Sequence, residues 1–389
     1  MKVLLFIDSL TGAGAQRQLV NLALGLDGRG HDVTLATYAP KDFFLSRLDG
    51  SGVAYLNFQK AYRFDPMPVW RLLRTVDRVA PDVLIAFLRT PSVYAEMVKV
   101  LRPSLPLVVS ERAGVDAGGL TRGDRAAGTL HRLATRVTGN SHGYLGRLVE
   151  ARPALASRTE VIYNGVDDVF FENGRRRGEG PLGEGDGTGD GHGEGGDGQR
   201  PIRLCVVAAR ATRQKAPLVM ARAVAKLSRR ELPPFTLEWI GPVDEGIALV
   251  RETVDEIARH RLDDIWRWVG PVKDVVARYP DYDALVSPSL YEGVANTVCE
   301  AMASGLPVIV TDIADNARIL ADGGGGLICP PDDAGALADA LQDFLSLSER
   351  ERVAMGRRAH ARASEQFSMT RFVDRWEGLC HRLVRESRA

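Results

Sequence analysis

Along the chain, short apolar runs rich in β-branched residues alternate with longer stretches whose apolar residues recur at helical spacing. In the first half, strands are expected at residues 3–7, 32–37, 83–86, 107–109, 136–138 and 160–162. Helical patterns lie between several of them, at residues 16–26, 68–79 and 142–151. Such alternation is typical of a parallel sheet covered by helices, and it predicts a doubly wound α/β domain.

The alternation stops in the middle of the chain and then begins again. From residue 178 to 198, 11 of 21 residues are glycine and most of the others are Asp or Glu, with His192 among them. Such a segment buries too little apolar area to offset its ordering entropy, so we predict a disordered linker with His192 solvated. Strands then follow at 203–208, 235–240, 266–269, 284–286, 307–310 and 326–329, with helices at 215–229, 245–259, 296–303, 334–345, 348–365 and 370–385.

A length of 389 residues suits two domains rather than one core. We predict Rossmann-like domains at residues 1–172 and 201–368, joined by a linker rich in Gly, Asp and Glu at 173–200. A C-terminal helix is expected at 369–389, and whether it crosses back to the first domain stays open. Open sheets of this type bind ligands at the carboxyl ends of their strands.

Composition excludes several classes of function. Fifty basic residues balance fifty acidic ones, which gives a nucleic-acid partner no electrostatic support. The four cysteines are scattered without a Cys-x-x-Cys pair, which argues against a zinc site and against a secreted disulfide framework. We find no signal-peptide pattern and no apolar run of about 20 residues. The expected location is the cytoplasm, with contact at a membrane surface left open. His31 precedes a strand and is expected to pack structurally.

Two glutamates eight residues apart, Glu292 and Glu300, are the most informative feature for chemistry. Glu292 lies in a loop after a strand-like run, and Glu300 lies inside the following helix. Between them are the backbone N–H groups of a helix start, which attract phosphate. A carboxylate on each side of such amides suits a sugar, its phosphates and a ribose.

Two cations follow the first strand of the second half. Arg210 and Lys215 are placed to stabilise negative charge that grows on a leaving group, and Arg213 between them is expected to face solvent. A plain basic surface loop is the alternative.

The stretch from Glu292 to Val308 resembles the E-x7-E signature of retaining glycosyltransferases of the glycogen synthase-like class, glycosyltransferase family 4, whose GT-B fold has two Rossmann-like domains facing a cleft. The resemblance implies that Glu300 binds the ribose hydroxyls, that Glu292 orients the transferred sugar, and that Gly293 lets the backbone approach it. The alternative for Glu300 is a solvated acid on a helix surface. The donor-binding residues implied are Gly14, Gly293, Val294, Ala295, Asn296, Thr297 and Glu300.

Arg210 and Lys215 match the Arg and Lys with which the family neutralises the departing diphosphate, so the implied catalytic residues are Arg210, Lys215 and Glu292. The chain departs from the family at Ala209, where glycine is usual, and at Ala216, where it is frequent. In the first strand-to-helix loop, Ala13 and Gln16 replace a Gly and a Glu of the family pattern, and Gly14 alone is retained.

Ser110-Glu111-Arg112 resembles an element of one branch of the family, whose members often build lipid-linked or surface glycans. Glu111 and Arg112 are therefore acceptor-side candidates, and Asn164 is a third, because the stretch Tyr163–Asp167 also resembles a family element. An ion pair inside the protein is the alternative explanation for Glu111 and Arg112.

The hypothesis is a retaining glycosyltransferase that uses a nucleotide-diphosphate sugar, preferably a UDP-sugar, and needs no metal or other cofactor. The expected acceptor is a glycan or a polyprenyl-linked molecule, and an anionic membrane surface is a candidate partner through Arg122, Arg125, Arg132, Arg136 and residues 175–177. Two alternatives stay open. One is a nucleotide-sugar 2-epimerase of the same architecture, and the other is an inactive nucleotide-sugar-binding protein, suggested by Ala13, Gln16 and Ala209.

Overall fold

The computed structural model describes residues 1–61, 65–112, 121–179, 200–321 and 324–388. The chain divides into two compact units, the first formed by Met1–Gly165 with Phe367–Ala389 and the second by Val166–Gln366. The first unit thus ends a few residues before the predicted boundary at 172, and the last helix belongs to it. Helix α6 (Asp168–Glu179) occupies the start of the predicted linker, and residues 180–199 lie outside the described part of the chain.

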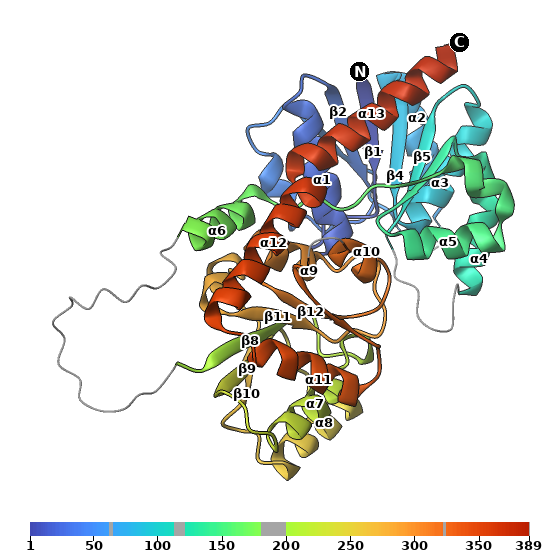
Figure 1. Cartoon of the computed structure of the whole chain (residues 1–389). Helices are drawn as coiled ribbons and strands as arrows, with labels where there is room; N and C mark the ends of the chain where they lie inside the picture. Colours follow the sequence, from blue (N-terminus) through green and yellow to red (C-terminus); the bar gives the residue numbers. More distant parts are fainter. Residues whose placement is uncertain (62–64, 113–120, 180–199, 322–323, 389) are drawn as a thin grey trace. The chain divides into compact units, whose positions relative to one another are not determined.

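The first unit contains a seven-stranded parallel sheet in the order β3-β2-β1-β4-β5-β6-β7 (Figure 1). Val3 of the central strand lies level with Val33 on one side and Val83 on the other. The strands are β1 (Lys2–Phe6), β2 (Asp32–Thr37), β3 (Ala54–Asn57), β4 (Val83–Phe87), β5 (Leu107–Glu111), β6 (Arg136–Gly139) and β7 (Thr159–Val161).

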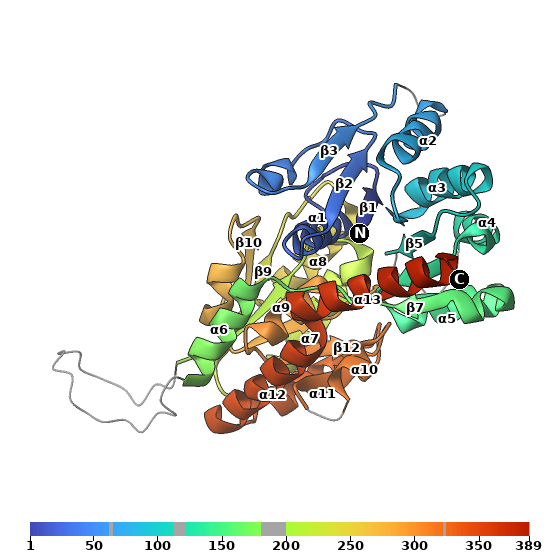
Figure 2. The same cartoon turned by 90° about the horizontal axis from the view of Figure 1, so that it is seen from above.

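Helices cover both faces of this sheet, as the alternating side chains of β1 require. Val3 and Leu5 pack with residues of α1 (Gly14–Asp27) and α13 (Met369–Arg388), among them Trp376. The opposite face is covered from α2 (Met67–Val79), α3 (Arg89–Leu101) and α5 (His142–Ala151). Figure 2 shows α2, α3 and α4 (Arg122–Leu130) in a row, away from α1.

The last helix packs tightly on the first one. A Cβ placed on Gly25 of α1 would come within 2.4 Å of Val373 Cγ2 on α13, so only glycine allows this approach. Trp376 is fully buried in the same core. The C-terminal helix is therefore an integral part of the first unit.

The second unit has a six-stranded parallel sheet in the order β10-β9-β8-β11-β12-β13. Its strands are β8 (Ile202–Val207), β9 (Phe235–Ile240), β10 (Trp266–Gly270), β11 (Ala284–Ser287), β12 (Val308–Thr311) and β13 (Gly326–Cys329). Its other helices are α7 (Pro217–Leu227), α8 (Ala248–Arg259), α9 (Asn296–Ala303), α10 (Asn316–Leu320), α11 (Ala334–Leu345) and α12 (Glu349–Phe367). The expected pair of doubly wound domains is confirmed.

In both sheets the strand order reverses beside the first strand. β1 lies between β2 and β4, and β8 lies between β9 and β11. Ligands of open α/β sheets bind at such switch points, outside the carboxyl ends of the strands. Among the described residues, no helix has both the length and the apolar character needed to cross a membrane.

Candidate active site

The loop after β8 carries the first two candidate residues. Arg210 is exposed, and the short 3₁₀ turn Arg213–Lys215 follows it. Ala216 ends the turn in the left-handed region, with φ of 50°, and Pro217 begins α7. Ala216 therefore adopts the backbone conformation that the glycine frequent at this position in the family reaches most easily. Arg213 is exposed, as predicted.

A close backbone approach forms the floor of this loop. Gly241, just after β9, has φ of 139°, and a Cβ there would lie 1.8 Å from the carbonyl oxygen of Ala208. The amide of Ala211 donates to the carbonyl of Pro242 at 3.2 Å. Glycine is thus the only residue that lets the exits of β8 and β9 come together.

Two hydrogen bonds join the loop after β8 to the loop after β11, the neighbouring strand. The backbone amide of Leu290 donates to the carbonyl of Gln214 at 2.8 Å, and Gln214 Nε2 donates to the carbonyl of Tyr291 at 3.0 Å. These contacts bring Lys215 next to Glu292, and Lys215 Nζ forms an ion pair with Glu292 Oε1. The two side chains keep 19% and 13% of their surface exposed, so the pair remains reachable from solvent.

Helix α9 starts directly behind Glu292. Its N-cap residue is Ala295, whose methyl group cannot cap the first N–H groups, and the first turn contains no acidic side chain. Gly293, Val294 and Ala295 are buried in the approach to the helix, while Asn296 and Thr297 are half-buried. The positive end of the helix dipole therefore lies next to Lys215 and Glu292, in an arrangement that suits an anion.

Glu300 lies in the second turn of α9 and is only 4% exposed. Its burial excludes the alternative of a solvated acid on a helix surface. A buried carboxylate is costly unless it is hydrogen-bonded, and such a group is unusual without a structural or ligand-binding role.

In the first unit, Gly14 is the first residue of α1, after the N-cap residue Ala13. Gln16, which stands where the family pattern has Glu, is buried and donates from Nε2 to Asp8 Oδ1 at 3.0 Å. The same Asp8 oxygen accepts from the amide of Ser9 at 2.7 Å. Gln16 therefore fixes the loop after β1 from inside.

Arg112 follows β5 and meets a second predicted residue. Its Nη1 donates to Asn164 Oδ1 at 2.6 Å, and its Nε donates to Ser110 Oγ at 2.9 Å. The guanidinium lies 4.4 Å from the ring centroid of Phe87, and burial lowers its pKa. Its Nη2 is buried and has no hydrogen-bond partner in the described part of the chain.

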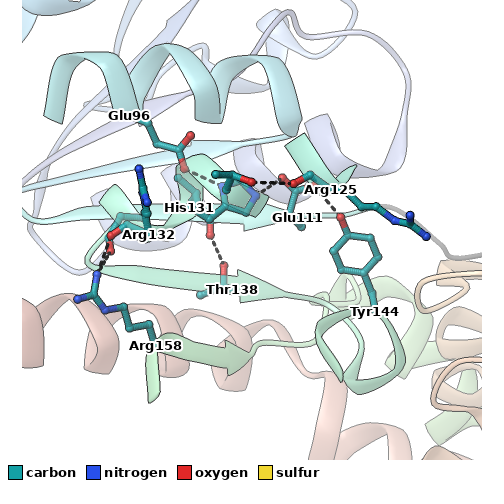
Figure 3. A network of polar contacts seen from close by, with 11 residues as sticks. Glu96, Glu111, Arg125, His131, Arg132, Thr138, Tyr144 and Arg158 are labelled. Atoms are coloured by element: carbon teal, nitrogen blue, oxygen red, sulfur yellow. Dashed lines mark hydrogen bonds and ion pairs between the residues drawn. The ribbon is translucent and has the colours of Figure 1, made fainter. Parts of the chain in front are cut away.

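Glu111 belongs to a buried network that the sequence did not reveal (Figure 3). His131 lies between two carboxylates, with Nδ1 at 2.6 Å from Glu96 Oε1 and Nε2 at 3.1 Å from Glu111 Oε1. Tyr144 donates from its hydroxyl to Glu111 Oε2 at 3.4 Å. Burial lowers the pKa of His131, but the hydrogen bonds to Glu111 and Glu96 outweigh it and raise the pKa to about 9. Glu111 thus pairs with His131 and not with Arg112.

The structure therefore brings together Lys215 with Glu292 in one unit and Arg112 with Asn164 in the other. Sequence analysis missed His131, Glu96, Gln214 and Gln18. Gln18 both donates to the carbonyl and accepts from the amide of Gly165, at 2.8 Å each. None of these residues stands in a local pattern with its partners, so only the fold reveals them.

Two family models match the chain. The model described as Glycosyltransferase Family 4 matches residues 12–170, and the model described as Glycosyl transferases group 1 matches residues 201–346. Together they span most of both units.

Curated relatives are similar over parts of the chain. Sucrose synthase of Acidithiobacillus caldus is 33% identical over 198 residues, which is 46% of this chain and 24% of that protein. D-inositol 3-phosphate glycosyltransferase of Mycolicibacterium smegmatis is 29% identical over 250 residues, which is 62% of this chain and 51% of that protein. The match thus spans less than two thirds of the length of either relative.

Solved structures show the same fold over nearly the whole length. Anabaena Alr3699/HepE in complex with UDP superimposes with a TM-score of 0.78 at 20% identity, covering 98% of this chain and 100% of that chain. A glycosyltransferase from Rickettsia africae ESF-5 also reaches 0.78, at 16% identity, covering 98% of each chain. The two matched models and this shared architecture show that the chain is built from glycosyltransferase domains, the first matching Glycosyltransferase Family 4 and the second matching Glycosyl transferases group 1, and that it has the GT-B fold.

Proposed function

We propose that this chain is a retaining, metal-independent glycosyltransferase that moves a sugar from a nucleotide-diphosphate sugar, preferably a UDP-sugar, to a glycan or lipid-linked acceptor. The observation that carries the proposal is the Lys215–Glu292 ion pair beside the uncapped start of α9. It joins a cation, a carboxylate and the N–H groups of a helix start at the carboxyl ends of β8 and β11. A diphosphate attached to a sugar matches that combination.

The charged residues divide the work of the reaction. As the bond between the sugar's anomeric carbon and the diphosphate breaks, negative charge grows on the leaving oxygen, and Lys215 and Arg210 stabilise it. The α9 amides hold the phosphates. Glu292, whose Oε1 is engaged by Lys215, orients the sugar hydroxyls through its other oxygen, while Glu300 accepts from both ribose hydroxyls.

Retention follows from attack on the same face that the leaving group departs from. The acceptor oxygen forms its bond to the anomeric carbon, and its proton passes to the departing phosphate oxygen. The step therefore balances without a protein base or a metal ion. On the acceptor side, Arg112 is the strongest candidate. Its buried Nη2 donates to no other residue in the described part of the chain and is therefore able to donate to an acceptor.

A UDP-sugar is favoured because solved structures of HepE, which share the fold, contain UDP and UDP-glucose. The test is a thermal-shift panel of UDP-, GDP- and ADP-sugars, followed by transfer assays in EDTA and determination of the product's anomeric configuration by NMR. We expect one UDP-sugar to stabilise the protein and the product to keep the donor configuration.

Each other outcome points elsewhere. Conversion of the donor into its C2 epimer without an acceptor identifies an epimerase. Binding without turnover under any acceptor identifies an inactive nucleotide-sugar-binding protein. The absence of stabilisation by any nucleotide sugar overturns the proposal.

The proposal includes peripheral contact with an anionic membrane that carries the acceptor. The predicted arginine cluster supports it little, since Arg136 is paired with Glu386 and residues 175–177 belong to the second unit. The surface formed by α2 and α3, which pack beside each other, supports contact with a membrane better than the arginine cluster does. Its exposed apolar side chains are Trp70 at 45%, Met97 at 51%, Val100 at 60% and Leu101 at 54%.

Basic groups accompany these apolar side chains. Arg74 lies over the Trp70 ring at 3.7 Å from its centroid, and Arg71 and Arg78 are on the same helix. Apolar side chains among arginines match the interface of an anionic bilayer. We expect sedimentation with vesicles containing phosphatidylglycerol but not with pure phosphatidylcholine. The double variant Trp70→Ser/Met97→Ser should lose it, whereas Ile247→Ser in the second unit should not. Binding that is independent of anionic lipid removes this part of the proposal.

A further inference from the structure

Three side chains with metal-binding atoms meet on the first unit, although they are far apart in sequence. His31 lies in the turn before β2, and Glu377 and His381 lie on α13. Glu377 and His381 are four residues apart, so they lie on the same face of the helix. Neither the scattered cysteines nor any local motif indicates this group, because about 350 residues of chain separate His31 from the other two members.

The geometry of the group is close to that of a coordination site. One ligand atom from each residue lies within 4.8 Å of the other two. His31 Nε2 is 2.6 Å from Glu377 Oε1, and the rings of His31 and His381 have their centroids 5.9 Å apart. In a tetrahedral zinc site with bonds of about 2.0–2.1 Å, ligand atoms are roughly 3.3 Å apart. His381 is exposed, so its side chain has room to move toward the other two ligands.

Neighbouring groups fix the orientation of two ligands. Arg29 Nη1 donates to Glu377 Oε2 at 2.5 Å, which leaves Oε1 facing His31. His31 Nδ1 is 3.2 Å from the terminal amino nitrogen of Met1, so Nε2 is the ring nitrogen that faces the group. Zinc binding at Nε2 requires the ring proton to lie on Nδ1, where the amino group accepts its hydrogen bond after losing a proton of its own. Partners of this kind orient the ligands of metal sites in general. The side chain of His31 is 9% exposed and that of Glu377 is 23% exposed, so the group is open to solvent on the His381 side.

We propose that His31, Glu377 and His381 bind a zinc ion, with water as the fourth ligand. Two imidazoles and one carboxylate are a donor set that zinc accepts readily. The ion would tie α13 to the turn between α1 and β2 and so strengthen the attachment of the C-terminal helix. His31 precedes β2, at the sheet edge opposite to Gly14 and Arg112, so this site takes no part in sugar transfer. It is independent of the metal-free mechanism proposed above.

The test uses the full chain after treatment with EDTA. Isothermal titration with Zn²⁺ should show one site per chain, and Co²⁺ should give the strong visible absorption of a tetrahedral ion. Zn²⁺ should also raise the unfolding temperature in a concentration-dependent manner. His381→Ala should weaken Zn²⁺ binding at least about 10-fold, and because His381 is exposed the variant should fold as the wild type does. Glu377→Gln is a second, nearly isosteric variant.

His260→Ala is the matched control. His260 also faces a glutamate four residues away, Glu256, at 3.3 Å, but in the described residues no third ligand joins them. This variant should bind Zn²⁺ as the wild type does. The proposal is overturned if the wild type binds no Zn²⁺, or if His381→Ala and Glu377→Gln both bind Zn²⁺ as tightly as the wild type does. It is also overturned if Co²⁺ gives the weak spectrum of an octahedral ion.

Discussion

The carboxyl edges of the two sheets use their polar side chains in opposite ways. At the carboxyl end of the second sheet, Lys215 and Glu292 form a partly buried ion pair that solvent still reaches, and Gln214 links the two loops that carry them. At the edge of the first unit, Glu111 is 3% exposed and bonded to His131, and Arg112 is occupied by Asn164. The carboxyl end of the second sheet keeps its charged side chains accessible. That of the first sheet uses most of its charged side chains in buried contacts that fix its own structure.

This difference indicates that the two units contact a ligand in different ways. A diphosphate is common to all nucleotide sugars, and accessible charge at a helix start recognises it whatever the sugar. The first unit instead builds a rigid frame from buried polar contacts, with Arg112 Nη2 as a remaining donor. The experiments below should separate a framework role from a reactive one.

Removing His131 should have the largest effect, and the effect should be on stability. His131→Ala leaves the buried carboxylates Glu96 and Glu111 without the imidazole that joins them, and breaking a buried pair in this way costs about 3–5 kcal/mol. Denaturant unfolding should report the loss. His142→Ala, which removes an exposed histidine of the same unit, should leave stability within about 0.5 kcal/mol of wild type. A stable His131→Ala protein would contradict the framework role.

The pH dependence of stability provides a second measurement of the same network. The folded pKa of His131, about 9, exceeds its unfolded value of about 6.5, so its contribution is complete below pH 6.5 and is lost as the pH rises toward 9. Over that window the free energy of unfolding should fall by up to about 3 kcal/mol. His131→Ala should flatten the profile. A wild-type profile that is already flat would show that the carboxylates do not hold the proton.

Lys215→Ala should have the next largest effect, now on turnover. Loss of a group that stabilises leaving-group charge lowers kcat by about 100- to 1000-fold. Arg213→Ala removes an exposed cation two residues away and should transfer sugar at a rate within a few-fold of wild type. Steady-state transfer assays with both variants test the assignment. Near-normal kcat for Lys215→Ala would mean that the accessible ion pair is structural, and the contrast between the two edges would disappear.

Glu300→Gln should weaken nucleotide binding without unfolding the protein. A hydrogen bond to a charged group contributes about 1.5–3 kcal/mol, so affinity for the preferred nucleotide should fall roughly 10- to 100-fold. The measurement is isothermal titration. Glu256→Gln changes another buried helix acid of the same unit, 8% exposed, and should bind nucleotide normally. Equal affinities in the two variants would assign Glu300 a packing role.

The sequence predicted the polar contacts at the carboxyl end of the second sheet better than those of the first sheet, for a physical reason. Lys215 and Glu292 each lie in the loop that follows a strand, and β8 and β11 are neighbours, so a local pattern is enough to bring these two residues together. His131, Glu96 and Glu111 come from three elements that share no spacing rule. Strand β3 was missed because it is a short, half-buried edge strand. Helix α3 was missed because exposed Met97, Val100 and Leu101 hide its polar face.

Gln214→Ala should have the smallest effect, and it tests how the loops after β8 and β11 are held together. The variant loses the side-chain bond to the carbonyl of Tyr291 but keeps the backbone bond from Leu290 and the Lys215–Glu292 ion pair, so the loops remain joined. A single hydrogen bond contributes about 1 kcal/mol, and a Lys215 held less firmly toward Glu292 should lower kcat about five-fold. Gln342→Ala is the control, since it loses one bond to Arg230 elsewhere in the second unit. It should reduce stability by a similar amount and leave kcat unchanged. If both variants lose stability equally and neither loses turnover, the accessible pair does not depend on the joined loops, and the edge owes its geometry to the strands alone.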